Sequence, residues 1–366
     1  MSAARQPLVL MMAGGTGGHV YPALAVAREL IERGYRIHWL GTARGLEQRV
    51  VPAAGIELHH LSVRGVRGKS PLHRLFGMFA LLLASLQALW LVLRLAPRCV
   101  VGMGGYASGP GGAAAWLLRK PLLVQEQNAV AGTTNRLLAP LARTVVAGFP
   151  GAFRGDLDCR VLGNPVRREL LAAGAAAAYD YDGGRALRLL VLGGSLGARP
   201  LNQLLPAALE YLPATGPGLQ VWHQTGEDHL ADARAAWERL PGIDVRPMAF
   251  IEDMAAAYAW ADLVLCRAGA LTVSELAIMG RPALLVPLPH AIDDHQTANA
   301  RYLADCGGAR LLPQAELDAE RLAALLAELV ASPQTLAQMA AAAAEAGRPG
   351  ATDAVCDCCE ELIHGR

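Results

Sequence analysis

Three glycine-rich segments have the composition of turns that bind phosphate groups. They are residues 14–19 (GGTGGH), 102–110 (GMGGYASGP) and 193–199 (GGSLGAR). Each follows an apolar run typical of a buried strand and precedes a segment typical of a helix. Glycine lets the backbone approach a ligand closely, and the first N–H groups of a helix attract an anion. Any one segment alone also fits an ordinary strand-to-helix turn, but three in one chain favour binding of phosphate groups.

His19 adds a titratable group to the first of these turns. An imidazole at the start of a helix, at the carboxyl edge of a sheet, can serve as a general base near neutral pH. A structural histidine is the alternative. The turn lacks the G-x-G-x-x-G spacing of a dinucleotide site and the lysine of a P-loop, which weighs against a nicotinamide-dependent oxidoreductase.

The second half of the chain holds groups suited to a nucleotide sugar. In residues 267–275 (RAGALTVSE), Gly269 is expected to open a helix, with Thr272 and backbone N–H groups facing a phosphate. Glu275 can accept two hydrogen bonds from a ribose diol. Residues 293–299 (DDHQTAN) suit sugar hydroxyls, although the same residue types also form helix caps.

The elements that must position these groups alternate between strand and helix. Predicted strands cover residues 8–13, 36–40, 56–62, 99–103, 122–125 and 144–148, then 187–192, 219–224, 243–247, 263–266 and 283–287. Helices are expected over 21–33 and 132–142 and from 319 onward, and a linker near 163–178, where residues 172–178 are low in complexity. This alternation predicts an α/β fold of two Rossmann-like, doubly wound parallel sheets facing across a cleft.

Composition narrows the class of protein. The 366 residues carry 33 Lys+Arg and 32 Asp+Glu, a net charge of +1, so we expect no nucleic-acid partner. With 53% hydrophobic and 18% charged residues, general disorder is excluded. Seven cysteines do not form a disulfide framework, and the CDCC cluster at residues 356–359 lacks further ligands, so we expect free thiols and no metal site. No signal peptide is expected.

One basic, apolar segment departs from this balance. Between Glu57 and Glu126 the chain has no acidic residue and eight basic ones: Arg64, Arg67, Lys69, Arg74, Arg94, Arg98, Arg119 and Lys120. Within it, residues 75–93 carry no charge. Because this run lies between two strands of one predicted sheet, we expect a crossover helix, since a membrane-spanning helix would split the sheet. One face would pack on the sheet, and the other, with Leu75, Phe79 and Leu82, would contact an anionic membrane surface; burial between layers or in a dimer is the alternative.

Taken together, these segments resemble the MurG family of glycosyltransferases. The similarity is collinear from about residue 8 to residue 302 and rests on residues 14–19, 21–22, 102–110, 126–128, 163–167, 193–199, 267–275 and 296–299. It implies a GT-B fold whose N-terminal acceptor- and membrane-binding domain spans residues 1–166 plus a returning C-terminal helix, 350–366. The C-terminal domain, 167–349, would bind UDP-N-acetylglucosamine. The implied reaction is an inverting transfer of N-acetylglucosamine to the 4-hydroxyl of lipid I, giving lipid II for peptidoglycan.

The resemblance also implies roles for individual residues. His19 would be the catalytic base, Glu275 would hold the ribose, Gln296 the sugar hydroxyls, and Ile251 the uracil through its backbone. The acceptor pyrophosphate would meet Gly104, Gly105 and Tyr106. The remaining donor-site residues would be Thr16, Gly17, Gly18, Asn128, Arg167, Ser195, Ala270, Leu271, Thr272, Val273 and Ser274.

No cofactor or metal is implied. The expected partners are UDP-N-acetylglucosamine, lipid I, an anionic membrane surface and other cell-wall synthesis proteins, with the enzyme peripheral on the cytoplasmic face of the inner membrane. Other GT-B enzymes, such as a lipid glycosyltransferase or a UDP-sugar epimerase, remain alternatives, as does an integral membrane scaffold.

Overall fold

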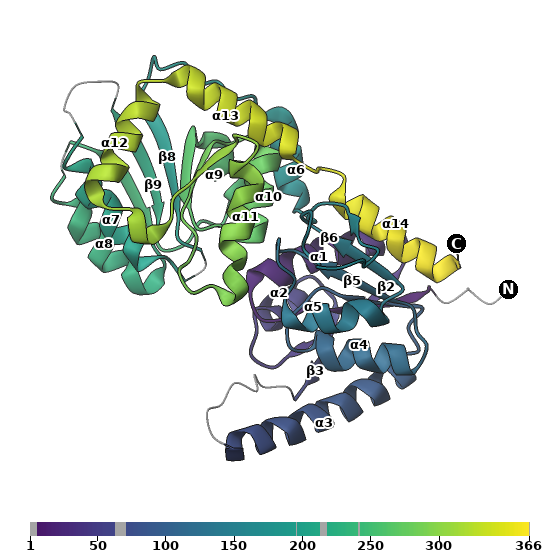
Figure 1. Cartoon of the computed structure of the whole chain (residues 1–366). Helices are drawn as coiled ribbons and strands as arrows, with labels where there is room; N and C mark the ends of the chain where they lie inside the picture. The colour runs from purple at the N-terminus through teal and green to yellow at the C-terminus, as the bar shows by residue number, and fades with distance from the viewer. Residues whose placement is uncertain (1–5, 63–70, 195, 213–217, 241, 366) are drawn as a thin grey trace. The chain divides into compact units, whose positions relative to one another are not determined.

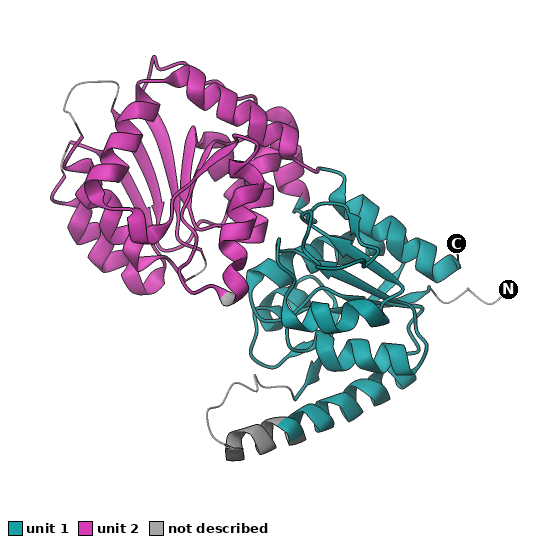
Figure 2. Ribbon diagram, in the orientation of Figure 1, with its two compact units in different colours: residues 1–167, 349–366 teal, residues 168–348 magenta. Residues whose placement is uncertain are grey.

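The chain folds into two units, each built around one parallel sheet (Figures 1 and 2). The computed structural model describes residues 6–62, 71–194, 196–212, 218–240 and 242–365, without the side chains of residues 71–77, 79 and 292. Unit 1 comprises residues 1–167 and 349–366, and unit 2 comprises residues 168–348. The assignment of acceptor and donor binding to separate domains stays a prediction.

Unit 1 has a seven-stranded sheet in the order β3-β2-β1-β4-β5-β6-β7. Every strand pairing recorded in its described residues is parallel, and a central strand such as β1 is buried on both faces, which is why it is apolar throughout (LVLMM). The strands are β1 (Leu8–Met12), β2 (Arg36–Thr42), β3 (Glu57–Leu61), β4 (Cys99–Gly102), β5 (Leu122–Glu126), β6 (Thr144–Ala147) and β7 (Arg160–Val161).

Helices cover both faces of this sheet. Successive side chains of each strand point to opposite faces of the sheet, so the sheet contributes to two hydrophobic cores. One core lies beneath α1 and α14, and the other lies beneath α3 and α4. Arg33, which follows α1, forms ion pairs with Asp353, Asp357 and Glu360 of α14, at 3.2, 2.6 and 3.2 Å, so these contacts hold α14 against α1 within unit 1. The helices are α1 (Gly17–Glu32), α2 (Glu47–Ala53), α3 (Pro71–Leu95), α4 (Ser108–Leu117), α5 (Thr133–Leu138) with the 3₁₀ turn Ala139–Leu141, and α14 (Ala351–His364).

Unit 2 repeats this design with a six-stranded sheet in the order β10-β9-β8-β11-β12-β13. Its strands are β8 (Leu187–Leu192), β9 (Leu219–Gln224), β10 (Asp244–Met248), β11 (Leu263–Cys266), β12 (Ala283–Leu285) and β13 (Ala309–Leu311). Its helices are α6 (Arg168–Ala176), α7 (Arg199–Leu209), α8 (Leu230–Trp237), α9 (Met254–Trp260), α10 (Ala270–Met279), α11 (His295–Ala304), α12 (Ala319–Val330) and α13 (Pro333–Ala346), with 3₁₀ turns at Glu227–His229, Ile292–Asp294 and Gln314–Glu316.

The structure corrects the predicted linker and several boundaries. Residues 172–176 belong to α6, because alanine favours helix and Leu170 of the same helix is buried. The helix predicted over 132–142 divides into α5 and a 3₁₀ turn that contains Pro140. Helix α1 begins at Gly17, earlier than predicted, and the short strands β7 and β13 were not predicted. Cys356, Cys358 and Cys359 are free, buried thiols of α14.

Helix α3 is the predicted crossover between β3 and β4. Ala84, Ala88 and Val92 are buried against the sheet, whereas Leu82 and Leu86 are exposed. Arg64, Arg67 and Lys69 lie outside the described residues, as do the side chains of Arg74, Leu75 and Phe79. Among the described residues, none of the helices combines the length and hydropathy needed to cross a bilayer.

Candidate active site

Two glycine-rich turns of unit 1 touch each other at the carboxyl ends of β1 and β4. These strands are neighbours at the point where the strand order reverses direction, which is where open α/β sheets bind ligands. Gly105 has φ +87°, and a Cβ on it would lie 2.5 Å from the carbonyl oxygen of Gly14. A Cβ on Gly104 (φ +95°) would lie 2.7 Å from Nδ1 of His19. Glycine is therefore required at both positions, because only backbone without a side chain fits this approach.

His19 is half-buried in the first turn of α1 and is oriented by Gln127. Its Nδ1 lies 2.9 Å from Oε1 of Gln127, whose Nε2 donates to the carbonyl of Met103 (3.0 Å) and to Oε1 of Gln125 (2.6 Å). Because a carbonyl only accepts, the Gln127 atom beside Met103 must be the nitrogen, and the atom beside His19 must be the oxygen. His19 Nδ1 therefore carries the proton in the neutral ring, and Nε2 is left as the basic nitrogen.

A chain of buried amides holds Gln127 in turn. Gln125 Nε2 donates to Oδ1 of Asn164 (3.2 Å), and Asn164 Nδ2 donates to the carbonyl of Gln127 (2.9 Å). Gln125, Gln127 and Asn164 are all buried. Such a fully paired network fixes one arrangement of its members. The sequence motifs at residues 126–128 and 163–167 thus meet behind the predicted base.

Glu47 is a site residue that the sequence analysis missed. Its fully buried carboxylate accepts hydrogen bonds from the backbone N–H of Gly15 (2.9 Å), from the N–H of Thr42 (3.0 Å) and from the Thr42 hydroxyl (2.8 Å). A Cβ on Gly14, Gly41 or Gly45 would come within 3 Å of the Glu47 side chain. Glu47 therefore holds the first glycine-rich turn in place. The glycine at position 45 was a weak signal for it.

The other predicted residues of unit 1 lie around these turns. Thr16 caps α1 in an extended conformation, and its carbonyl accepts from the N–H of His19 (3.2 Å). Gly17 and Gly18 form the first turn of α1. Asn128 donates from its backbone and its side chain to Oε1 of Glu126. Of the other predicted binding residues, Tyr106 has an exposed side chain, and the Arg167 guanidinium lies 5.5 Å from the ring centre of Tyr21.

In unit 2 the turn after β8 packs against the turn after β9. A Cβ on Gly197 (φ +75°) would lie 1.9 Å from the carbonyl oxygen of Thr225, and Gln224 Nε2 donates to the carbonyl of Gly194 (3.0 Å). Asn202 of α7 donates to the same Thr225 carbonyl (2.9 Å). Backbone contact between the turns again requires glycine. The predicted donor residue Ser195 lies outside the described residues.

Behind this turn, His223 of β9 is buried as a neutral imidazole. Trp237 Nε1, which can only donate, lies 3.1 Å from His223 Nδ1, so Nδ1 accepts, and Nε2 donates to Oδ1 of Asn202 (3.0 Å). Burial lowers the pKa of His223 from 6.5 to about 4. His223 therefore orients Asn202, which in turn holds the Thr225 carbonyl against Gly197.

The second unit-2 turn, after β11, leads into α10. Gly269 is the N-cap in an extended conformation, and Ala270, Leu271, Thr272, Val273 and Ser274 form the first turns of the helix. Asn299 of α11 is buried and donates to the carbonyl of Ala268 (3.1 Å), which fastens the turn from behind. Because β8 and β11 are neighbours, this turn and the described residues of the turn after β8 lie at the point of unit 2 that corresponds to the His19 site of unit 1.

Glu275 and Gln296 each form a side-chain hydrogen bond in unit 2, and their predicted roles, like that of Ile251, stay predictions. The buried Glu275 carboxylate accepts through Oε2 from the Tyr258 hydroxyl (3.1 Å). Gln296 Oε1 accepts from the backbone N–H of Leu288 (2.9 Å), and Ile251 is buried. Arg267 donates to the carbonyls of Val286 and Pro287 and to Oε1 of Gln314, so its guanidinium braces the segment after β12.

Two Rossmann-like sheets in one chain, each with a glycine-rich turn at its switch point, define a GT-B fold. Residues 9–147 match the protein family described as "Glycosyltransferase family 28 N-terminal domain". Residues 188–355 match the family described as "Glycosyltransferase family 28 C-terminal domain". The chain belongs to glycosyltransferase family 28.

Individual relatives narrow the comparison further. Proteins named UDP-N-acetylglucosamine–N-acetylmuramyl-(pentapeptide) pyrophosphoryl-undecaprenol N-acetylglucosamine transferase in Pseudomonas fluorescens strain Pf-5 and Azotobacter vinelandii strain DJ are each 54% identical to this chain. Each match covers 98% of this chain and 99% of the relative. The crystal structure of Acinetobacter baumannii MurG matches with a TM-score of 0.84 and 40% identity, over 97% of this chain and 99% of that one.

A more distant structure shares the fold alone. A UDP-N-acetylglucosamine 2-epimerase matches 99% of this chain and 97% of its own, with a TM-score of 0.66 and 15% identity. At this identity the similarity to the epimerase shows a shared fold and gives no support to an epimerase activity.

Proposed function

We propose that the chain transfers N-acetylglucosamine from UDP-N-acetylglucosamine to the 4-hydroxyl of the N-acetylmuramyl sugar of lipid I, giving lipid II. The observation that carries this proposal is 54% identity over 98% of the chain to relatives named for that transfer. The arrangement of the turns supports it, because the reaction must bind one diphosphate in the donor and one in the acceptor.

His19 acts as the general base in this proposal. With Nδ1 held by Gln127, Nε2 takes the proton of the acceptor 4-hydroxyl. The hydroxyl oxygen forms a bond to C1 of N-acetylglucosamine, the bond from C1 to the diphosphate oxygen breaks, and its electron pair leaves with UDP. Attack from the side opposite the leaving group inverts the configuration at C1.

Unit 2 provides the donor site. The first N–H groups of α10 and the Thr272 hydroxyl bind the diphosphate and stabilise the charge that develops on it. The Glu275 carboxylate, oriented by Tyr258, accepts hydrogen bonds from the ribose hydroxyls. Gln296 is anchored through its oxygen on Leu288, which leaves its amide N–H groups to meet the sugar hydroxyls.

The same proposal assigns the acceptor pyrophosphate to the turn after β4. Gly104 and Gly105 have positive φ, and this turn precedes the start of α4 at Ser108. Backbone N–H groups of such a turn can surround an anion. Tyr106 is exposed beside them and can contact the acceptor.

An apolar face of α3 accounts for access to a lipid-borne acceptor. Five of its exposed side chains repeat every three or four residues and form the α3 stripe: Met78, Leu82, Leu86, Trp90 and Leu93. Leu81 and Leu83 are also exposed and widen this apolar face. Helix α4 packs alongside α3 (Figure 1) and exposes Trp116 and Leu117. Arg94 and Arg119 lie at the ends of these two helices, where they can meet anionic lipid headgroups. We therefore place the enzyme at the periphery of the cytoplasmic face of the inner membrane.

Two measurements on the purified chain test the proposed function. UDP-N-acetylglucosamine should raise the melting temperature and NAD should not, because only the former matches the donor site. UDP release should require lipid I and should not occur with diacylglycerol. Release with diacylglycerol alone would indicate a different lipid glycosyltransferase, and no release with lipid I would contradict the proposal.

A further inference from the structure

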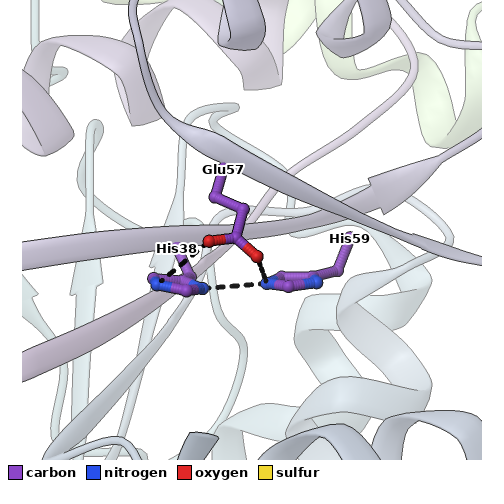
Figure 3. A group of neighbouring side chains, drawn as sticks. All are labelled: His38, Glu57 and His59. Carbon is purple, nitrogen blue, oxygen red and sulfur yellow. Dashed lines mark hydrogen bonds and ion pairs between the residues drawn. The ribbon is translucent and has the colours of Figure 1, made fainter.

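Two histidines and a glutamate meet at the edge of the unit 1 sheet, away from the glycine-rich turns. His38 lies on β2, and Glu57 and His59 lie on the edge strand β3 (Figure 3). Nδ1 of His38 is 2.8 Å from Nε2 of His59, and the two imidazole rings meet edge to edge with their planes only 12° apart (Figure 3). Oε1 of Glu57 is 3.5 Å from Nε2 of His59, and Oε2 is 3.6 Å from Nε2 of His38.

Strand register creates this group. His38 is paired with Glu57, and Leu40 is paired with His59. Since side chains two residues apart share a face of a strand, all three side chains lie on the face that carries Leu40 and Leu61. Leu40 and Leu61 pack with residues of α3, so the group lies on the face of the sheet that α3 covers, with Glu57 at its exposed edge.

We propose that His38, Glu57 and His59 bind a divalent transition-metal ion such as Zn²⁺, which fastens the edge strand β3 to β2. One ligand atom from each residue lies within 4.8 Å of the others. Two nitrogens bound to one tetrahedral zinc ion lie about 3.3 Å apart. The facing nitrogens are 2.8 Å apart and point at each other, so the two rings need to separate by about half an ångström and to tilt until both nitrogens point at the ion. Imidazole and carboxylate are ligands that zinc accepts, and water can complete the coordination.

The protonation chemistry of the group suits this role. One of the two facing nitrogens must carry a proton in the metal-free state, since they form a hydrogen bond. When the ion binds, that proton moves to the other nitrogen of the same neutral ring, so no net proton is released. His38 would then carry its proton on Nε2, which faces Oε2 of Glu57, leaving Oε1 for the metal. A carboxylate that orients a ligating histidine is a common feature of metal sites.

The electrostatic surroundings contain groups of both signs. Burial lowers the pKa of His38 and of His59, which keeps the rings neutral and able to coordinate. Glu57 acts in the opposite direction and supplies the negative charge that attracts a cation. Arg36, near His38, and Arg94 of α3, near His59, repel one. Because Glu57 provides the only carboxylate of the group, we expect it to be essential for binding.

Titration of Co²⁺ into the untagged, chelator-treated full chain tests the site. One equivalent should bind with visible d–d absorption, and Zn²⁺ should displace it. His38→Asn and Glu57→Gln should each weaken binding about tenfold or more. His60→Asn is the matched control, because His60 is adjacent on β3 but pairs with Gln48; it should bind like the parent.

The Glu57 variant keeps the test decisive if the histidine variants fold poorly, because the Glu57 side chain is largely exposed. Unchanged affinity in Glu57→Gln, equal weakening in His60→Asn, or a thiolate charge-transfer band that assigns the ion to cysteine would each overturn the proposal. Hydrogen exchange provides a second measurement: Zn²⁺ should slow exchange of β3 amides in the parent but not in Glu57→Gln. Unchanged exchange in the parent would refute the fastening of β3.

Discussion

Replacement of Gln127 by alanine tests whether the orientation of His19 contributes to catalysis. The variant removes the oxygen that accepts from His19 Nδ1 at 2.9 Å. No other side-chain hydrogen bond of the described residues then fixes the His19 ring tautomer, so Nε2 is the basic nitrogen for only part of the time. His19 itself remains, and the glycine-rich turn that carries it is still held by Glu47.

The expected loss follows from the energy of one hydrogen bond. A typical bond contributes about 1 kcal/mol, with a range of roughly 0.5–1.5, so kcat should fall about fivefold, and between about twofold and about thirteenfold over that range. Removal of the base by His19→Ala should cost about 10²–10⁴ in kcat. Since Gln127 acts through His19, Gln127→Ala in the His19→Ala background should cause no further loss of kcat.

Steady-state UDP release with saturating lipid I gives kcat for the parent, the two single variants and the double variant, which together form a double-mutant cycle. Gln48→Ala is a matched control, because Gln48 forms a similar amide–imidazole contact with His60 (2.9 Å) that joins neither glycine-rich turn. It should leave kcat unchanged. If Gln127→Ala lowers kcat equally in both backgrounds, its effect is independent of His19, and the orienting role is refuted. If His19→Ala retains full kcat, His19 is not the base.

Three further predictions concern stability and membrane binding. Gly105→Ala should lower the unfolding free energy by about 2–4 kcal/mol, because the added Cβ would collide with the neighbouring turn. Gly15→Ala is the control: Gly15 also has positive φ, but no atom lies within 4 Å of its Cβ position, so the loss should be only about 1 kcal/mol. Equal losses in denaturant titrations would show that contact between the turns contributes little to stability. His223 has a pKa of about 4 in the folded state and 6.5 in the unfolded state. Between pH 6.5 and pH 4 the unfolded state therefore binds more protons, so the unfolding free energy falls as the pH is lowered through this range, by up to about 3 kcal/mol. Denaturant titrations across this range should show a shallower pH dependence for His223→Gln, and parallel curves would contradict the assignment. Leu86→Gln should weaken sedimentation with anionic vesicles about fivefold, and Leu137→Gln, an exposed leucine of α5, should not; equal effects would remove the α3 stripe from the membrane-binding surface.

The strands were the most predictable part of the fold. Residues 187–192 match β8 in full, because a strand buried in a parallel sheet is apolar along most of its length. Residues 219–224 also match β9 in full, although Gln220, His223 and Gln224 make half of that strand polar. Alanine-rich residues 172–176 were misassigned, since low complexity was given more weight than helix propensity. Strands as short as β7, two residues long, carry too little periodic signal to predict.

The glycine-rich turns could be predicted from sequence, but the residues that hold them could not. Glu47 acts on Gly15 across 32 positions and Gln127 on His19 across 108. Neither spacing contains a local pattern, because the contacts depend on which strands are neighbours. The group of His38, Glu57 and His59 was missed for the same reason, since it requires the register between β2 and β3.

Strand order explains why both units place their candidate ligand turns at equivalent points. In unit 1 the chain winds from β1 outward to β3 and then crosses to β4 on the other side of β1. In unit 2 it winds from β8 to β10 and crosses to β11. Each crossover leaves the first strand and the fourth side by side, and the helices that follow them lie on opposite faces of the sheet. The contacts that require glycine differ between the units: Gly105 meets the turn of β1 across the switch point, whereas Gly197 meets the turn of β9, on the other side of β8. The two units therefore share the position of their candidate ligand turns through strand order, and each secures its turn by a different backbone contact.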